Sequence, residues 1–473
     1  MANSAEQPFR VDRDSMGEVR VPAAAYYGAQ TQRAIDNFGM ISGLRSHPTI
    51  IESFLQLKLA AATVNGRLGT VDPQRSAAIA QACEKILADL PGQPWMNQFV
   101  VDAFQAGAGT SLHMNVNEVL ANLALEILGA ARGDYKRLSP NDHVNFGQST
   151  NDVVPTVIHL TGLKLAGQLV AVVNELAGRF GRKGEEFANV IKSGRTHLQD
   201  AVPITLGQEF RGYAAALRQS AELIASAARP MEEVCLGGSA VGTGLNSHPQ
   251  YREQVVAELA RLTRLPLRIP SDPRRAMQSM QPVASFHSAV RNLALELTRI
   301  ANDLRLLASG PTTGFDEIVL PPVQPGSSIM PGKVNPVLAE CLNMLCFEVI
   351  GNDATVAQAV AAGQLELNVM MPLLAHKVTS SCQILLNFLP QFGARCVDGI
   401  TANAAQCRKF FESSVSLATV LNPLIGYLAA AEVAKEAVKT GRSIVEIVRD
   451  RKLVDESKLA ELLDPKNITG PLG

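Results

Sequence analysis

The sequence lacks the charge imbalance that marks proteins which bind nucleic acid or membrane surfaces. Its 43 lysines and arginines balance 44 aspartates and glutamates, so the net charge is -1 at pH 7. No bulk field therefore draws the chain to a polyanion or to an acidic bilayer. Any site that binds an anion has to be local, and we expect neither nucleic acid nor a membrane among the partners.

Metal-binding and disulfide patterns are also missing. The 473 residues include only seven cysteines, none of them in a CxxC pair, and the eight histidines form no HExxH motif. Scattered cysteines in a long chain indicate buried thiols rather than a disulfide framework or a structural zinc site. We predict no catalytic metal and no cofactor.

No segment predicts export or membrane insertion. The first seven residues lack the basic and apolar regions of a signal peptide, and no apolar run approaches the roughly 20 residues of a membrane span. We therefore expect a cytoplasmic protein. Because 47% of the residues are hydrophobic, the chain can bury a large core, and its length suggests two or three domains.

What the sequence does contain is a series of long helical patterns. One of them places apolar residues at alternating steps of three and four, which is typical of the seam of a long bundle helix. Its members are Val283, Phe286, Val290, Leu293, Leu297, Ile300, Leu304 and Leu307. Similar patterns predict helices over residues 154–180, 206–228, 337–360 and 373–392. Helices of this length suit a bundle better than a βαβ arrangement.

Residues 326–336 read Gly-Ser-Ser-Ile-Met-Pro-Gly-Lys-Val-Asn-Pro and predict a specialised loop. Gly326 and Gly332 allow backbone geometry that other residues avoid, while Pro331 and Pro336 remove donors and fix the chain. Such a loop can fold over an anion and offer it backbone N–H groups, a lysine charge and an asparagine amide. Taken alone, the composition also suits a surface connector.

Three shorter blocks precede this loop. They are Gly-Ala-Gly-Thr-Ser at 107–111, Gln-Ser-Thr-Asn-Asp at 148–152 and Gly-Arg-Thr-His-Leu-Gln-Asp at 194–200. The second block lies just before a long apolar helix, where its side chains can cap the helix and its N-terminus can attract a carboxylate. The third block is expected in a loop, between Gly194 and Pro203, that leads into the helix beginning near Leu206.

The four blocks, in this order and at these spacings, resemble the signature segments of the fumarase/aspartase superfamily. Members of that superfamily eliminate a group from succinyl-type substrates and release fumarate. The resemblance extends from about Val11 to about Leu463. It implies an all-α, three-domain fold, with a mainly helical N-terminal domain at 1–148, a central domain of long bundled helices at 149–403 and a small helical C-terminal domain at 404–473.

The resemblance also implies an assembly and a set of roles. We expect a homotetramer with a 20-helix core and with active sites shared between subunits. Ser327 is the expected general base, acting as an oxyanion, and His197 is the second expected catalytic residue, oriented by Glu340. The expected substrate contacts are Thr110, Ser111, Ser149, Thr150, Asn151, Thr196, Lys333 and Asn335.

Small differences favour the aspartase branch of the superfamily. Ala108 stands where fumarases usually carry serine, and Thr150 stands where they usually have a second serine. We therefore expect anti elimination of ammonia from L-aspartate to give fumarate, with these small molecules as partners. Three alternatives stay open: hydration of fumarate to malate, a lyase for an N-substituted aspartate, and a structural role without activity. His113 stands where both branches usually have asparagine, so its position relative to the ligand is a further question.

Overall fold

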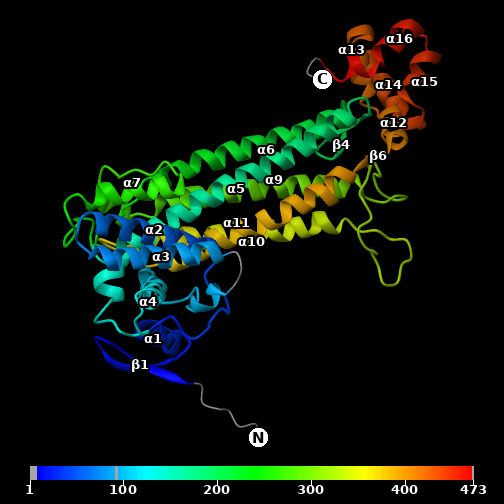
Figure 1. Cartoon of the computed structure of the whole chain (residues 1–473). Helices are drawn as coiled ribbons and strands as arrows, with labels where there is room; N and C mark the ends of the chain where they lie inside the picture. The colour runs from blue at the N-terminus through cyan, green and yellow to red at the C-terminus, as the bar shows by residue number, and fades with distance from the viewer. Residues whose placement is uncertain (1–7, 91–93, 471–473) are drawn as a thin grey trace. The chain divides into compact units, whose positions relative to one another are not determined.

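The computed structural model describes residues 8–90 and 94–470, and the chain is mostly helical (Figure 1). It divides into two compact units, each made of three stretches of chain. The first unit comprises residues 1–168, 223–291 and 349–383, and the second comprises 169–222, 292–348 and 384–473. The three domains expected from the sequence remain a prediction.

All the long helices predicted from apolar spacing are present. They are α5 (Thr150–Glu186), α6 (Leu206–Ala228), α9 (Gln281–Leu307), α10 (Val337–Ala361) and α11 (Met371–Arg395). Every one of the eight apolar positions of the predicted seam in α9 is buried. The alternating steps of three and four therefore identified both the helix and its core face.

Side chains of the long helices meet within each unit. In the second unit the Phe180 ring of α5 lies 5.9 Å from the Phe210 ring of α6, and Asn343 of α10 donates a 2.7 Å hydrogen bond to Asn302 of α9. In the first unit His287 of α9 contacts Asp353 of α10 at 2.8 Å and Ser381 of α11 at 3.0 Å. Aromatic packing and buried polar contacts thus fix neighbouring rods to one another.

The first unit also contains a β-hairpin and several shorter helices. They are β1 (Phe9–Asp14) and β2 (Gly17–Pro22), which pair antiparallel, and α1 (Ala29–Phe38), α2 (Pro48–Arg67), α3 (Pro73–Asp89), α4 (Thr110–Ile127), α7 (Tyr251–Thr263) and α8 (Pro273–Gln278). Helix α1 is attached to α4 through one buried carboxylate. Glu118 accepts hydrogen bonds from the backbone N–H groups of Gly28, Gln30 and Thr31, at 2.8, 2.8 and 3.1 Å. This acceptor satisfies the otherwise unpaired first turn of α1.

The second unit contains a β-hairpin where the sequence predicted a loop. Strands β3 (Ile191–Thr196) and β4 (Gln199–Thr205) pair antiparallel, so the loop prediction for residues 194–203 is wrong. The strands are rich in Ile, Thr and Val, which favour extended backbone, and the register shifts between Ser193 and Gly194, beside the position opposite Pro203. A bulge of this kind tolerates a proline within a strand.

The C-terminal part of the second unit is a cluster of short helices. They are α12 (Ala404–Ser413), α13 (Leu417–Ile425), α14 (Tyr427–Thr440), α15 (Ile444–Asp450), α16 (Glu456–Leu462) and α17 (Pro465–Ile468). Just before α12 in the chain, β6 (Thr401–Ala402) pairs antiparallel with β5 (Ile318–Val319). Buried Leu421, Val433 and Ile447 belong to one apolar cluster that also includes Ile191 of β3. The hairpin and these helices therefore share a core.

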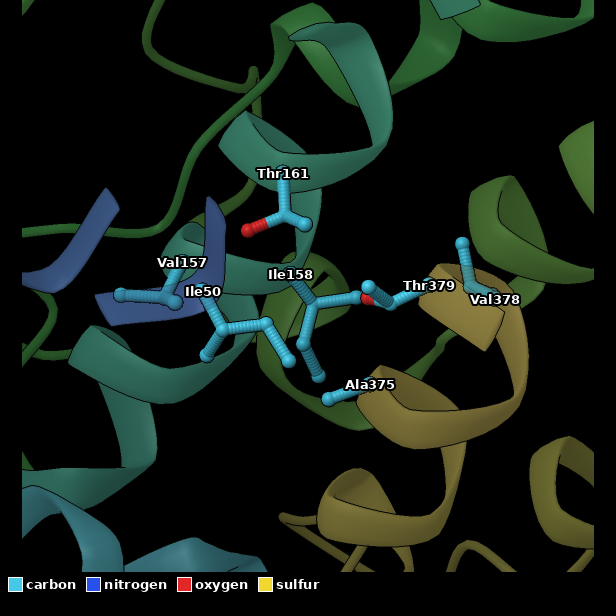
Figure 2. A pocket seen from close by; sticks show the side chains of 7 residues that line it. All are labelled: Ile50, Val157, Ile158, Thr161, Ala375, Val378 and Thr379. Carbon is cyan, nitrogen blue, oxygen red and sulfur yellow. The ribbon is translucent and has the colours of Figure 1, made fainter. Parts of the chain in front are cut away.

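A small apolar pocket lies in the first unit between α2, α5 and α11 (Figure 2). Its lining residues are Ile50, Val157, Ile158, Thr161, Ala375, Val378 and Thr379. It leaves room for about one water molecule and presents almost no polar surface. It is a packing gap rather than a substrate site.

Helix α5 is long and apolar enough to cross a membrane by length and composition, although the sequence led us to expect no such stretch. More than half of its most apolar 18-residue stretch is buried inside the fold. Val153, Leu160 and Leu165 of this helix are inaccessible to solvent. A fully buried core helix has the same composition as a membrane span, because both are surrounded by apolar groups.

Candidate active site

The predicted site residues divide between the two units. Those in the first unit are Thr110, Ser111, Ser149, Thr150 and Asn151; those in the second unit are Thr196, His197, Ser327, Lys333, Asn335 and Glu340. Each group occupies the beginning of a helix, a hairpin turn or a closed loop. The candidate residues therefore fall into two groups, one in each unit, which we call the partial sites.

The hydroxyl of Ser327 is surrounded by backbone donors of its own loop. Its Oγ accepts hydrogen bonds from the N–H groups of Ile329 at 3.2 Å and Met330 at 3.0 Å. Two N–H groups aimed at one oxygen stabilise negative charge on it, which lowers the cost of removing its proton. The bonds also form a local turn, so the same geometry serves the structure of the loop.

Contacts between its two ends close this loop. The N–H of Gly326 donates to the carbonyl of Lys333 at 2.9 Å, and the side chain of Asn335 donates to the carbonyl of Gly326 at 2.6 Å. A Cβ atom at position 326 would lie 2.4 Å from the Lys333 carbonyl oxygen, so only glycine fits there. Beside the closed loop lies an open hollow lined by Lys333, Asn335 and Glu340, together with Arg305.

His197 sits at the tip of the hairpin in a conformation that is unusual for its residue type. Thr196 pairs with Gln199, which leaves His197 and Leu198 as the two turn residues, and both have φ of 57°. Turns with positive φ at both central residues normally use Asn or Gly, because larger side chains make the left-handed region unfavourable. Thr196 and His197 are exposed, and the turn holds the imidazole out from the unit.

Glu340, the expected partner of His197, occupies the first turn of α10 and is partly exposed. Within the part of the chain that the structure describes, no hydrogen bond or ion pair joins Glu340 to His197. The expectation that Glu340 orients the imidazole of His197 therefore remains a prediction.

Thr110 and Ser111 begin helix α4 directly after a distorted turn. Ala108 has φ of 61° and its N–H donates to the carbonyl of Val369 at 2.8 Å, while Gly109 has φ of 90°. Ala108 is buried, so it is a packing residue as well as a candidate selectivity position. The turn leaves Thr110 exposed and Ser111 buried at the helix start.

The start of α5 shows the capping that its sequence predicted. Ser149 Oγ accepts a 3.2 Å hydrogen bond from the N–H of Asn151, and Asp152 accepts a 2.9 Å bond from the N–H of Ser149. Asn151 donates its side-chain amide to the carbonyl of Ala240. Ser149, Thr150 and Asn151 are partly exposed, at the positive end of a 37-residue helix.

A buried network behind Thr150 was missed by the sequence analysis. Lys58 of α2 is fully buried, and its Nζ contacts His113 Nε2 at 2.8 Å, Asn145 Oδ1 at 3.0 Å and Gln148 Oε1 at 2.8 Å. His113 Nδ1 in turn contacts Thr150 Oγ1 at 2.9 Å. His113 is fully buried and contacts Thr150 from the interior of the unit. Two signals were available: the unusual His113 and a lysine within the apolar run Leu-Gln-Leu-Lys-Leu-Ala-Ala-Ala.

Burial strongly perturbs the ionisable groups of this network. Desolvation lowers the pKa of Lys58 to about 7, partly opposed by the nearby charge of Asp152. Desolvation also lowers the pKa of His113 well below its ordinary value, and the charge of Lys58 acts in the same direction. Burial raises the pKa of Asp152 to about 6, although N–H groups of Ser149, Ser239 and Gly237 stabilise its charged form. The imidazole is therefore neutral, and Lys58 beside it is an ammonium only below about pH 7.

Among the residues that the structure describes, no group of three or more His, Cys, Asp and Glu side chains lies close enough to hold a metal ion. The seven cysteines are all unpaired there, and six of them are buried. Burial raises the pKa of the Cys235 thiol to about 12, so it remains protonated at neutral pH.

Comparison with known proteins covers nearly the whole chain. The family described as Lyase matches residues 17–351, and that described as Fumarase C C-terminus matches residues 417–470. The aspartate ammonia-lyase of Pseudomonas aeruginosa is 46% identical over 464 residues, which cover 98% of this chain and 97% of that protein.

Two solved structures share the fold. A fumarate lyase/delta-crystallin structure from Brucella melitensis with bound cobalt has a TM-score of 0.94 at 46% identity, covering 98% of this chain and 100% of that chain. A class II fumarase from Schistosoma mansoni has a TM-score of 0.92 at 35% identity, again covering 98% of this chain and 100% of that chain.

Replacing Lys58 by methionine should change how stability depends on pH. Because burial lowers the pKa of Lys58 from 10.5 to about 7, the unfolded chain binds more protons than the folded chain between these values. The free energy of unfolding of the wild type should therefore rise with pH across this window relative to Lys58→Met, and this gain should be lost as the pH falls toward 7. Denaturation of both proteins near pH 7 and near pH 10 measures the change; a constant or shrinking difference would contradict it.

Proposed function

The chain belongs to the fumarase/aspartase superfamily of lyases, and from this membership we propose that it converts L-aspartate reversibly into fumarate and ammonia. The observation that carries the reaction is 46% identity to an aspartate ammonia-lyase over almost the full length of both proteins. Such similarity makes the chain a carbon–nitrogen lyase. We propose that the candidate residues of the two partial sites bind the reacting groups of the substrate.

The chemical difficulty lies in removing a proton from C3 of aspartate, next to a carboxylate. The electrons of the C3–H bond enter that carboxylate and give it a second negative charge, as an aci-carboxylate. When they return to form the C2–C3 double bond, the C2–N bond breaks and ammonia leaves. A site for this reaction needs a base at C3 and donors placed in advance around the carboxylate.

Ser327 is the proposed base. A serine hydroxyl is too weakly acidic to serve as an oxyanion in water, so its surroundings have to favour the charged form. The two N–H groups of Ile329 and Met330 that point at its Oγ support this role. Lys333 belongs to the same closed loop and adds a positive charge to it.

Lys333 and Asn335 are the proposed donors to the carboxylate that becomes the aci-carboxylate. Both line the hollow beside the loop, and Lys333 is exposed, with no ion pair among the residues described by the structure. An unpaired ammonium and an amide in one hollow can both bind a dianion. The Asn335 amide already donates to Gly326, so one of its two N–H bonds holds the loop while the other remains for substrate.

The helix starts of the first unit are proposed to hold the rest of the substrate. Ser149, Thr150 and Asn151 lie at the positive end of α5, and Thr110 and Ser111 lie at that of α4. Hydroxyl and amide groups at helix N-termini suit a substrate that carries both a carboxylate and an ammonium. Thr196 and His197, presented by the hairpin turn and oriented by Glu340, are proposed to complete the site at the leaving amine.

A homotetramer is proposed because the partial sites lie on separate units and long helices of the second unit expose apolar side chains. Leu295 of α9 is 49% exposed, and Met344 and Phe347 of α10 are 63% and 57% exposed. Large apolar groups on a helix face of a single chain indicate a surface covered by another copy. In such an assembly, sites shared between subunits would bring the two groups of residues together.

The leaving group is tested by the requirement for ammonium. The purified protein should consume fumarate rapidly only when ammonium is present and should produce L-aspartate. In the reverse direction of the proposed reaction, ammonia is the nucleophile that adds to C2 of fumarate. Fumarate consumption and product identity are followed with and without ammonium. Rapid malate formation that does not respond to ammonium would instead support fumarate hydration, and absence of both products would support a structural role.

Ser327→Ala should lose most of kcat, by about a hundredfold or more, because a positioned base contributes at least that much. Substrate binding should weaken less than kcat falls. The variant should also stop exchanging the C3 hydrogen of aspartate with deuterium from solvent. Ser328→Ala is the matched control, since it alters the neighbouring hydroxyl; exchange at the wild-type rate in Ser327→Ala would assign proton removal to another group.

Shared sites predict complementation between inactive variants. If the hairpin turn and the 326–336 loop of one site come from different subunits, mixing His197→Ala with Lys333→Ala under conditions of subunit exchange should restore part of the activity, because some hybrid sites would then contain an intact copy of both residues. Exchange is verified by mass spectrometry of differently tagged subunits. Hybrid tetramers without activity would place each site within one chain.

A further inference from the structure

The hydrogen bonds behind Thr150 determine where each proton in the network lies. Asn145 and Gln148 turn their amide nitrogens toward backbone carbonyls: Asn145 donates to Gln148 O, and Gln148 donates to Val144 O and Phe146 O. Their amide oxygens therefore face Lys58 as acceptors. With three N–H bonds, an ammonium at position 58 has one for each of these oxygens and one for the imidazole of His113.

With Lys58 charged, this arrangement sets the tautomer of His113. Nε2 then faces the third N–H bond of the ammonium as its acceptor and carries no hydrogen. The single proton of the neutral ring is then on Nδ1, which donates to Thr150 Oγ1 at 2.9 Å. The burial of His113 and the adjacent cation oppose a second proton on the ring.

The charge of Lys58 is compensated within the same region. Asp152 of α5 is the acidic group that acts on it, and the thiol of Cys83 on α3 is held neutral because burial raises its pKa. Tyr251 of α7 also stays neutral, since burial and the charge of Asp152 both raise its pKa. A buried cation needs an acceptor for each N–H bond and an opposite charge nearby, and this region offers both.

We propose that Lys58 and His113 are positioning residues that hold the Thr150 hydroxyl as a hydrogen-bond donor toward a carboxylate of the substrate. The inference rests on the proposed function, in which Thr150 contacts the substrate. One lone pair of Thr150 Oγ1 is occupied by the Nδ1–H of His113. Within the described part of the chain, the hydroxyl proton has no acceptor, and Thr150 is partly exposed at the positive end of α5. An anion in front of the helix is the acceptor that this geometry fits.

This role separates Thr150 from the amine. A hydroxyl that already accepts a bond from an imidazole retains one lone pair for an ammonium, whereas its proton is fully available to a carboxylate. Lys58 and His113 do not touch the substrate in this arrangement. They act through the orientation of one hydroxyl, and their removal should weaken the recognition of dicarboxylates as a class.

Two substitutions of His113 separate its two nitrogens. In His113→Asn the side-chain nitrogen can occupy the place of Nδ1 and donate to Thr150, but nothing reaches Lys58. In His113→Gln the side-chain oxygen can occupy the place of Nε2 and accept from Lys58, but nothing donates to Thr150. We expect kcat/KM for aspartate to fall about tenfold or more in His113→Gln and clearly less in His113→Asn. The dissociation constant of succinate, which has two carboxylates and no amine, should rise in the same order.

A double-mutant cycle shows whether His113 acts through Thr150. Thr150→Val removes the hydroxyl, so His113→Gln should cause little further loss in that background. In Thr150→Ser, which retains the hydroxyl, His113→Gln should still cause its full loss. Thermal unfolding of each variant is recorded alongside, because a purely structural role would make loss of activity follow loss of stability.

Several outcomes would overturn the proposal. Equal losses in His113→Asn and His113→Gln, or an undiminished effect of His113→Gln in Thr150→Val, would remove the link to Thr150. If the histidine variants fail to fold, Thr150→Val alone decides the matter: succinate binding as tight as in the wild type would refute the donor role. Turnover of aspartate by the wild type is measured first, since its absence refutes the proposed function, whereas succinate binding still tests Lys58, His113 and Thr150.

Discussion

The buried amino group of Lys58 is the constraint around which the first unit is organised. A cation without water needs a partner for every N–H bond, because an unpaired buried charge costs several kcal/mol. Its three acceptors come from α4 and from the segment that leads into α5. One side chain of α2 therefore ties together the region in which two helices begin, and those helices carry the candidate substrate contacts of this unit.

The second unit uses a cation in the opposite way. Lys333 is exposed on a loop that is closed by backbone contacts, and it lines an open hollow. Among residues 8–90 and 94–470 no acidic side chain pairs with Lys333, so no such partner would have to be displaced in its proposed role of binding an anion. The buried Lys58 holds neighbouring segments together through its three hydrogen bonds, whereas the exposed Lys333 is available to bind an anion in its proposed role. One side chain could not do both, because the first role needs all its N–H bonds to be occupied. At Ser327 the two N–H bonds that shape the turn would also stabilise negative charge on its oxygen, which its proposed role as base requires.

The sequence predicted those features that depend on local periodicity. The five long helices, the buried face of α9 and the cap of Ser149 on α5 follow from spacing and residue type, and the structure confirms them. The hairpin at 191–205 was missed because glycine and proline suggested a loop, whereas pairing across a bulge depends on contacts between strands. The roles of Ser327, His197 and the other site residues remain predictions. His113 stood out as an unusual residue, but its direction could not be read from spacing, because its partners lie 55 and 37 positions away along the chain.

The turn at His197 and Leu198 has a consequence for anyone who redesigns this protein. Two side chains sit there in backbone conformations that Asn and Gly adopt at lower cost, and Leu198 is 65% exposed without a packing reward. A design procedure that considers only the free energy of unfolding would replace both residues by Asn or Gly, because these relieve the backbone strain and raise stability. If His197 has the role proposed for it, thermostability and catalysis make opposite demands on this turn, and a library selected for stability should leave it unchanged.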